Sequence, residues 1–392
     1  MSSFLTLVIN SGSSSVKFSV FLSPEQTCVA SGAADGLGNE HAKIKLVSNG
    51  EKQVVPLPGA DHQQALEKCF EMFAEKGIDL DSIKTVGHRV VHGGEAFNSS
   101  VVINDDVIEK IKACSSLAPL HNPANLLGIE VTQKLIPGAT QIAVFDTAFH
   151  QSLDQIHYLY PVPWSWYEDY GVRKYGFHGT SHEYVSQQAV QQLNLDPKSH
   201  GVLVAHIGGG VSATAVENGK SVDTTMGLTP LEGLMMGTRS GDVDPSLHKY
   251  MADTAGMSLN EVDHQLNKAS GLLGISGVSD DMRPIEANAL EGDPRCLLAV
   301  DMFSLKLAKY LAALSVSLSR IDALVFTGGI GENSAFVRQK IVKYLVHLGF
   351  QIDEKLNEQN AAVISEISSR KIAVIATNEE LQIANHCLAL SK

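Results

Sequence analysis

Short runs of aliphatic and β-branched residues alternate along this chain with segments in which apolar residues recur at helical spacing. The runs predict strands at 5–9, 86–91, 141–145, 202–207, 323–327 and 371–376. Helical spacing is clear in Ala65–Phe73 and in a longer segment from about Leu297 to Ser319. Strands that alternate with helices in this way are typical of an α/β protein.

The pattern also contains an internal repeat. Residues 5–21 and 202–224 share one layout, which is a hydrophobic strand, a turn of small residues and a second strand. A repeat at this distance suggests a duplicated domain with a cleft between the copies, and two unrelated hairpins are the alternative. The length of 392 residues also favours two domains. We expect them at 1–150 and 151–380, with a C-terminal helix at about 380–392 that packs back onto the first domain.

Composition and charge disfavour several classes of protein. The chain is 44% hydrophobic and 19% charged, as in a globular enzyme, and no apolar run approaches the ~20 residues that cross a bilayer. The opening residues lack the features of a signal peptide. A formal net charge of −13 disfavours a nucleic-acid partner, and five scattered cysteines without a C-x-x-C pair argue against disulfides and zinc. We therefore expect a cytoplasmic protein with no membrane and no nucleic-acid partner.

Polar or glycine-rich clusters follow the predicted strands at 10–17, 146–150, 206–210, 327–333 and 377–380. In open α/β sheets, ligands bind beyond the carboxyl ends of the strands, so we expect these clusters to face one crevice. Glycines and backbone amides in such turns allow a phosphate group to approach the main chain closely. The grouping therefore predicts a site for a phosphate-bearing ligand.

Three of these clusters have the chemistry of a phosphate site. The turn within 10–17 carries hydroxyls and a lysine, although its spacing is not that of a P-loop and a plain hairpin is the alternative. The three glycines at 208–210 remove every Cβ from a turn, which either phosphate binding or tight turn geometry would explain. Segment 327–334 should open a helix at Asn333 or Ser334 and present amides to a nucleotide. A Rossmann dinucleotide turn is the alternative, which the missing G-x-G-x-x-G spacing disfavours.

Four charged or titratable residues stand out by their surroundings. Arg89 lies in an otherwise apolar strand and requires an anion, which is either an acid ligand or a structural carboxylate. Arg239 lies among small residues that would admit a ligand, and a solvated surface arginine is the alternative. His178 has glycine neighbours that favour an open site over a core position. Asp146, directly after a strand, could orient an arginine or a metal-bound water, or cap a helix.

The sequence resembles those of the acetate kinase family, within the superfamily of acetate and sugar kinases, Hsp70 and actin. The resemblance runs almost from end to end. It rests on the segments NSGSSSVKFSVF, GHRVVHGGE, LAPLHNPANLLGI, AVFDTAFHQS, RKYGFHGTSH, VDTTMGLTPLEGLMMGTRSGDVDP, SGLLGISG, FTGGIGENSAFVR and ATNEE. It implies a duplicated ribonuclease H-like core of the actin-like ATPase type, two domains with ATP bound in a central cleft, and a homodimer.

The resemblance also assigns roles to individual residues. Asn10 and Glu379 would place Mg²⁺, for which Mn²⁺ is an alternative, and Lys17 would approach the phosphates of ATP. Arg89 and Arg239 would flank the acid and the transferring phosphoryl group.

Further residues follow from the same motifs. His178 would stabilise charge in the transition state, and Asp146 occupies the position of the family's essential aspartate. The acid pocket would be lined by Val91, Leu120, Phe177 and Pro230. The nucleotide would be held by His206, Ile207, Gly208, Gly209, Gly210, Asp281, Met282, Arg283, Gly329, Ile330, Gly331, Glu332 and Asn333.

Three positions decide how closely this chain follows the family. Gly209 stands where relatives usually carry asparagine, so a side chain expected near the phosphates is missing. Met282 replaces the residue, often aromatic, that relatives carry there. Val91 would narrow the pocket around a methyl group, whereas propionate kinases tend to carry alanine.

The resemblance predicts reversible, Mg²⁺-dependent transfer of the γ-phosphoryl group of ATP to acetate, giving acetyl phosphate and ADP by direct in-line displacement. A propionate kinase or other short-chain acyl kinase is the alternative within the enzyme class. A non-catalytic, nucleotide-dependent clamp is the alternative outside it.

Overall fold

The computed structural model describes residues 3–119 and 121–391, which divide into two compact units. The first unit comprises Met1–Phe149 and Asn378–Lys392, and the second comprises His150–Thr377. The domain boundaries expected from the sequence, at 150 and about 380, lie beside these divisions. No helix in the described ranges is both long enough and apolar enough to pass through a membrane.

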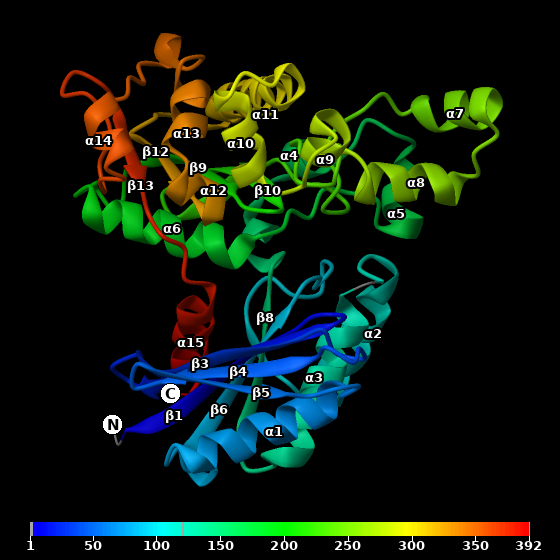
Figure 1. Ribbon diagram of the computed structural model, residues 1–392, viewed down its shortest axis with the longest axis vertical. Coiled ribbons are helices and arrows are strands. Elements are labelled where there is room, and N and C mark those ends of the chain that lie inside the picture. The colour runs from blue at the N-terminus through cyan, green and yellow to red at the C-terminus, as the bar shows by residue number, and fades with distance from the viewer. Residues whose placement is uncertain (1–2, 120, 392) are drawn as a thin grey trace. The chain divides into compact units, whose positions relative to one another are not determined.

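A mixed sheet forms the centre of the first unit (Figure 1). Its strands, in sheet order, are β5 (Glu51–Pro56), β4 (Lys43–Ser48), β3 (Thr27–Asp35), β2 (Ser15–Ser23), β1 (Phe4–Ser11), β6 (Ile83–Val90), β8 (Thr140–Phe145) and β7 (Val101–Val102). The helices around it are α1 (His62–Glu75), α2 (Asp105–Ala113), α3 (Asn122–Leu135) and α15 (Glu379–Leu390). β1, β6 and β8 run parallel, so their carboxyl ends meet at one edge of the sheet.

Alternating apolar residues in β1 give this sheet two buried faces. Leu7 and Ile9 pack in a core with residues of α1 and α3, which cover one face. Val8 points the other way and packs in a second cluster with Ile383 and Cys387 of α15. Helices on both faces therefore explain why most residues of β1, β6 and β8 are buried.

Helix α15 approaches the sheet closely because β6 carries a glycine beneath it. A Cβ at Gly87 would lie 2.6 Å from Cys387 Sγ and 2.6 Å from Ile383 Cγ2. The helix begins with an N-cap in which Asn378 Oδ1 accepts a hydrogen bond from the Leu381 amide (3.0 Å). The cap and the close packing fix the first turn of α15, which carries Glu379, against the first unit.

The second unit repeats the order of five strands of the first, β3-β2-β1-β6-β8. Its strands, in sheet order, are β11 (Lys220–Thr224), β10 (Val211–Glu217), β9 (Gly201–Ile207), β12 (Ala323–Thr327) and β13 (Lys371–Val374). β9 pairs antiparallel with β10 and parallel with β12, as β1 pairs with β2 and β6. β12 and β13 are parallel, as are β6 and β8. The predicted duplicated α/β fold is therefore confirmed.

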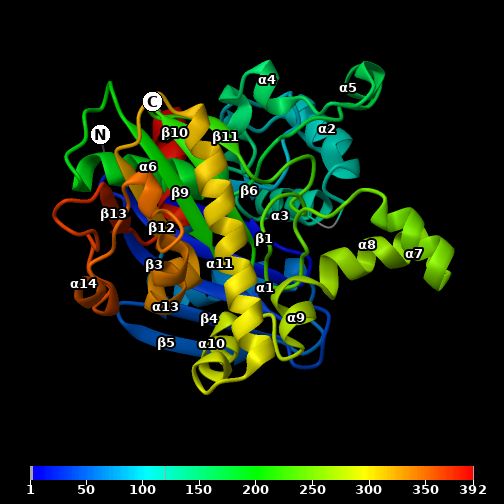
Figure 2. The same ribbon diagram turned by 90° about the horizontal axis from the view of Figure 1, so that it is seen from above.

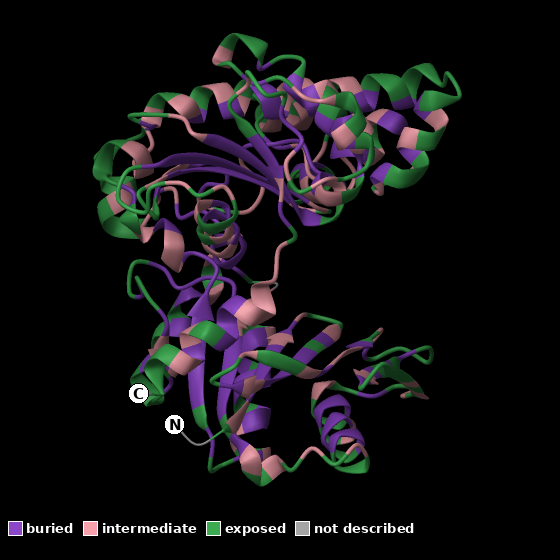
Figure 3. Cartoon of the chain, turned by 90° about the vertical axis from the view of Figure 1, so that its left-hand side faces the viewer, coloured by how far each residue is buried: buried purple, intermediate pink, exposed green. Residues whose placement is uncertain are grey.

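Helices cover both faces of this second sheet as well. The helices of this unit, in order along the chain, are α4 (Gln155–Tyr158), α5 (Trp164–Tyr170), α6 (Gly179–Gln192), α7 (Leu247–Ala255), α8 (Leu259–Lys268), α9 (Gly271–Ser276), α10 (Met282–Leu290), α11 (Pro294–Leu314), α12 (Gly328–Asn333), α13 (Ala335–Val342) and α14 (Glu354–Glu358). The sheet lies between α6 and the long helix α11, which crosses it in Figure 2. The strands between these layers are buried (Figure 3).

Two helix predictions need correction. The helix expected at about Leu297 to Ser319 is α11, which begins at Pro294 because Asp293 caps it, and ends at Leu314. Segment 327–334 forms the short helix α12 directly after β12, and Ser334 is then the N-cap of α13. The predicted start at Asn333 or Ser334 therefore applies to α13 and misses α12.

Candidate active site

At the carboxyl edge of the first sheet, Arg89 forms a two-atom contact with Asp146. Arg89 Nε donates to Asp146 Oδ1 (2.9 Å), and Arg89 Nη2 donates to Oδ2 (2.6 Å). Asp146 follows the last residue of β8 and is 2% exposed, and its amide donates to the carbonyl of Val90 (3.0 Å). Of the readings of Asp146 from the sequence, the structure shows the orientation of an arginine.

The guanidinium of Arg89 keeps part of its hydrogen-bonding capacity for a ligand. Among the described residues, no group accepts from Nη1, and the side chain is 22% exposed. Burial opposes its charge, but the attraction of Asp146 and Glu379 outweighs burial and raises the pKa of Arg89. A carboxylate therefore holds Arg89 in one orientation, and Nη1 can still donate hydrogen bonds to a ligand.

Glu379 adds a second carboxylate at the same edge. Its Oε2 lies 3.9 Å from Arg89 Nε. Burial raises the pKa of Glu379, and the charge of Asp146 adds to this rise while Arg89 and Lys17 oppose it. Lys17, on β2 and paired in register with Asn10 of β1, lines a groove of about 480 Å³ together with the N-terminal residues of α15. The structure thus places four of the predicted site residues of the first unit, Lys17, Arg89, Asp146 and Glu379, close together.

Oxygen donors at this edge suit a magnesium ion. Asn10 offers an amide oxygen at the end of β1, and Glu379 offers a carboxylate in the first turn of α15. The carboxylates of Asp146, Glu379 and Glu380 all raise the pKa of Arg89, and Lys17 is a second cation that acts on Glu379. An excess of negative charge and oxygen ligands are what Mg²⁺ requires, so the residues present fit this ion.

Buried asparagines on α3 hold the strand ends in place, and they were not among the predicted site residues. Asn125 Oδ1 accepts from the Val91 amide (3.0 Å), and Asn125 Nδ2 donates to the carbonyl of Ser11 (2.7 Å). Asn122 accepts from the amide of His92 (3.1 Å) and donates to its carbonyl (2.9 Å). Two asparagines three positions apart, on the same helix face as apolar residues such as Leu126 and Ile129, were the available signal.

In the second unit, three separate segments meet around one cavity of about 980 Å³. They are the glycine turn after β9, the start of α10 and helix α12 with the residue that follows it. Its lining contains eight of the predicted nucleotide residues, which are Gly208, Gly209, Asp281, Met282, Arg283, Gly329, Ile330 and Asn333. His206, Ile207, Gly210, Gly331 and Glu332 belong to the same segments but are not among the residues that line it. A Cβ at Gly209 would meet nothing within 4 Å.

Glu332 and the buried Arg338 stabilise the turn that forms one wall of this cavity. Glu332 Oε1 accepts from the amides of Gly328 (2.9 Å) and Thr377 (3.2 Å), so its carboxylate is committed to the backbone. Arg338, 0% exposed, donates through Nη1 to the carbonyl of Gly331 (2.8 Å). Burial lowers the pKa of Arg338 to about 10, with Glu286 opposing the shift. Arg338 was not predicted as a site residue, because its neighbours in the sequence do not distinguish it from a surface arginine.

His178 and Arg239 meet at the other side of the glycine turn. A Cβ at Gly210 would lie 3.2 Å from His178 Cε1, 3.3 Å from His178 Nε2 and 3.7 Å from Arg239 Nη1. His178 precedes α6 in a left-handed conformation (φ 57°), which is uncommon for a residue with a side chain and often marks a functional position. Arg239 Nη1 donates to the carbonyl of Pro230 (3.0 Å). Burial lowers the pKa of Arg239, which remains a cation at neutral pH.

The predicted acid-pocket residues are divided between the two units. Val91 belongs to the first unit and is 8% exposed. Phe177 and Pro230 belong to the second, where Phe177 is 2% exposed. Leu120 lies outside the described residues. The acid pocket as a whole therefore stays a prediction.

Comparisons with known proteins give one consistent family. The acetokinase family model matches residues 5–385. An acetate kinase of Ectopseudomonas mendocina (strain ymp) is 48% identical over 394 residues, which cover 100% of both chains. The solved structure of a propionate kinase from Francisella tularensis subsp. tularensis SCHU S4 has a TM-score of 0.94 at 46% identity and covers 98% of this chain and 99% of that one. The structure of Porphyromonas gingivalis acetate kinase has a TM-score of 0.94 at 41% identity, over 99% and 100%.

Proposed function

This chain belongs to the acetokinase family, and we propose that it transfers the γ-phosphoryl group of ATP reversibly to acetate, giving acetyl phosphate and ADP. The observation that carries the proposal is the cavity of the second unit, where three separate nucleotide motifs of the sequence line one space. Its volume of about 980 Å³ lies in the range of cavities that bind small molecules. The amides of the short α12 and of the glycine turn offer hydrogen bonds to the nucleotide.

The acid needs orientation and no general base. Acetate is ionised at neutral pH, so one of its carboxylate oxygens can attack the γ-phosphorus directly while the bond to the leaving oxygen of ADP breaks. Arg89, fixed by Asp146 and with Nη1 uncommitted among the described residues, is suited to hold that carboxylate. Val91 would restrict the space beside it to a methyl group and so favour acetate over propionate.

Charge on the transferring phosphoryl group must be offset while the bonds change. We assign this to Arg239 and His178, which flank Gly210, together with Arg89 and Lys17. Asn10 and Glu379 would hold Mg²⁺, with Mn²⁺ as a substitute, and the ion when bound supplies positive charge to the phosphate oxygens. We further expect the protein to act in the cytoplasm as a homodimer, an expectation that rests on the family.

A hydroxamate assay tests the proposal, because hydroxylamine traps acetyl phosphate as acetohydroxamate. We expect hydroxamate only when acetate, ATP and Mg²⁺ are all present. Arg239→Ala should lower the turnover by about 10²- to 10³-fold, because a charged contact to the transition state is lost. Arg320→Ala is the control, since Arg320 is an exposed arginine of the same unit paired with Asp322.

Two outcomes would count against the proposal. Hydrolysis of ATP without hydroxamate would favour a nucleotide-dependent clamp over a kinase. Full activity of Arg239→Ala would remove Arg239 from the transfer and leave the rest of the proposal standing.

A further inference from the structure

Two fully buried polar residues lie directly behind His178 in the second unit. Ser212, on β10, places its Oγ 2.9 Å from His178 Nδ1 and 2.7 Å from His182 Nε2. Both Ser212 and His182 are 0% exposed. Within the described part of the chain, these two ring nitrogens are the hydrogen-bonding partners of the Ser212 hydroxyl. Neither residue has a part in the transfer described above.

Counting protons fixes the direction of these hydrogen bonds. A serine hydroxyl has one hydrogen to donate, so it can donate to only one of the two rings. His182 Nδ1 is buried and has no hydrogen-bonding partner among the described residues. A buried N–H without an acceptor costs more than a buried lone pair without a donor. The proton of His182 therefore belongs on Nε2, from which it is donated to Ser212 Oγ.

The hydrogen of Ser212 is then free for His178. Because Ser212 Oγ accepts from His182, its own O–H points to the remaining neighbour, Nδ1 of His178. An Nδ1 that accepts a hydrogen bond carries no proton, so the proton of a neutral His178 lies on Nε2. Nε2 is on the side of the ring that faces Gly210 and Arg239 Nη1.

We propose that Ser212 and His182 are positioning residues that hold His178 as the neutral Nε2–H tautomer, ready to donate a hydrogen bond to an anionic oxygen beside Gly210. Arg239 opposes a second positive charge at this place. Burial, together with the charges of His150 and His206, lowers the pKa of His182 well below its usual value and keeps this ring neutral. The identity of the anionic oxygen, a phosphoryl oxygen, rests on the proposed function, whereas the tautomer rests on the geometry alone.

Nitrogen NMR of the unliganded protein tests the tautomer without any assay of activity. In the ¹⁵N-histidine-labelled full chain, a two-bond ¹H–¹⁵N correlation distinguishes Nε2–H, Nδ1–H and doubly protonated rings. The His178 signals are identified as those missing from the His178→Gln spectrum. We expect the Nε2–H pattern at pH 7.5 for both His178 and His182. An Nδ1–H or doubly protonated pattern for His178 would overturn the proposal.

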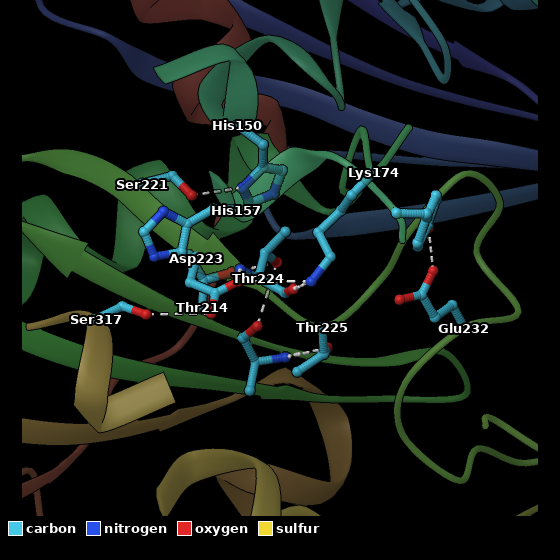
Figure 4. A network of polar contacts seen from close by, with 12 residues as sticks. His150, His157, Lys174, Thr214, Ser221, Asp223, Thr224, Thr225, Glu232 and Ser317 are labelled. Carbon is cyan, nitrogen blue, oxygen red and sulfur yellow. Dashed lines mark hydrogen bonds and ion pairs between the residues drawn. The ribbon is translucent and has the colours of Figure 1, made fainter. Parts of the chain in front are cut away.

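Substitutions at position 212 test the consequence for turnover. Ser212→Ala removes the donor to His178, and we expect a mixture of tautomers and a fall in kcat of at least about tenfold, with a smaller change in KM for ATP. Ser212→Thr keeps the hydroxyl and should recover most of the turnover. Thr214→Val is the matched control. It removes another buried hydroxyl of β10, whose hydrogen-bonding partner is Thr224 (2.9 Å, Figure 4).

The outcomes separate this proposal from the function on which it partly rests. A folded Ser212→Ala variant with unchanged kcat and unchanged histidine signals would overturn the proposal. If Ser212→Ala does not fold, the spectrum of the unsubstituted protein decides. If that spectrum shows the Nε2–H tautomer but acetate gives no acyl phosphate, the hydrogen-bonded chain stands and the proposed function fails.

Discussion

Among single residues, Val91 bears most directly on which acid is used. It follows β6 and is almost buried, and its amide is fixed by Asn125. Alanine would open space for about one methylene, which is worth ~1 to 3 kcal/mol in specificity. We expect Val91→Ala to raise the ratio of kcat/KM for propionate over acetate by about tenfold or more, measured with both acids in competition.

The neighbouring Val90 provides the control for that substitution. Val90 packs in the core of the first unit with Phe97 and Ile103. Val90→Ala should therefore lower stability and leave the ratio of the two acids unchanged. If Val91→Ala also leaves the ratio unchanged, Val91 does not line the acid pocket.

His88 makes the first unit sensitive to mild acid. It is 1% exposed on β6, and its Nε2 lies 2.7 Å from Gln141 Oε1. Burial lowers the pKa of His88 from 6.5 to about 4, and the contact with Gln141 opposes the shift. As the pH falls below about 6.5, His88 is therefore protonated in the unfolded chain before it is protonated in the folded one. The free energy of unfolding decreases from there down to about pH 4, by up to about 3 kcal/mol.

Hydrogen exchange can measure this loss. Between pH 7.5 and 5, the free energy of protection of the β6 and β8 amides, corrected for intrinsic exchange rates, should fall by about 2 kcal/mol in the wild-type protein. His88→Gln should not show this loss. His41→Gln, which changes an exposed histidine of the same unit, should behave as the wild type. Equal losses in the wild type and His88→Gln would show that His88 is not the group responsible.

Between elements, the contact of α15 with β6 joins the end of the chain to the site. Gly87 allows Ile383 and Cys387 to approach, and a Cβ there would force these two side chains, or the helix that carries them, to move. We expect Gly87→Ala to destabilise the first unit by about 1 to 3 kcal/mol and to lower activity, because Glu379 lies in the first turn of the displaced helix.

The matched substitution is Gly138→Ala, because a Cβ at Gly138 would meet nothing within 4 Å. Thermal unfolding and exchange of the α15 amides should show a loss for Gly87→Ala and no loss for Gly138→Ala. Identical behaviour of the two variants would mean that α15 does not need the glycine.

In the whole molecule, the sequence predicted those features that local patterns encode. The strand–turn–strand layout at residues 5–21 and 202–224 is contiguous in each copy, and both copies have the same strand pairing. The nucleotide residues lie in three glycine-rich or helix-opening segments, each recognisable by itself, and eight of them line one cavity. Short-range signals are sufficient where the function depends on backbone amides at strand ends.

Contacts between distant residues could not be predicted in this way. Asn125 reaches Ser11 across 114 positions, and Arg338 is buried against the carbonyl of Gly331 although its sequence neighbours suggest a surface helix. The hydroxyl of Ser212 lies between two histidines, although in the sequence Ser212 looks like an ordinary strand residue. Such partners are set by packing between elements, about which single-sequence periodicity carries no information.

The central claim is that an acetate oxygen attacks the γ-phosphorus of ATP, and an isotope label tests it most directly. Acetate with ¹⁸O in both positions is incubated with the enzyme, ATP and Mg²⁺, and the product is then cleaved with hydroxylamine, which attacks the carbonyl carbon and releases phosphate. The account predicts one ¹⁸O atom in that phosphate, seen by ³¹P NMR or mass spectrometry, because the bridging oxygen comes from acetate. Unlabelled phosphate would contradict it, since the bridging oxygen would then not have come from acetate.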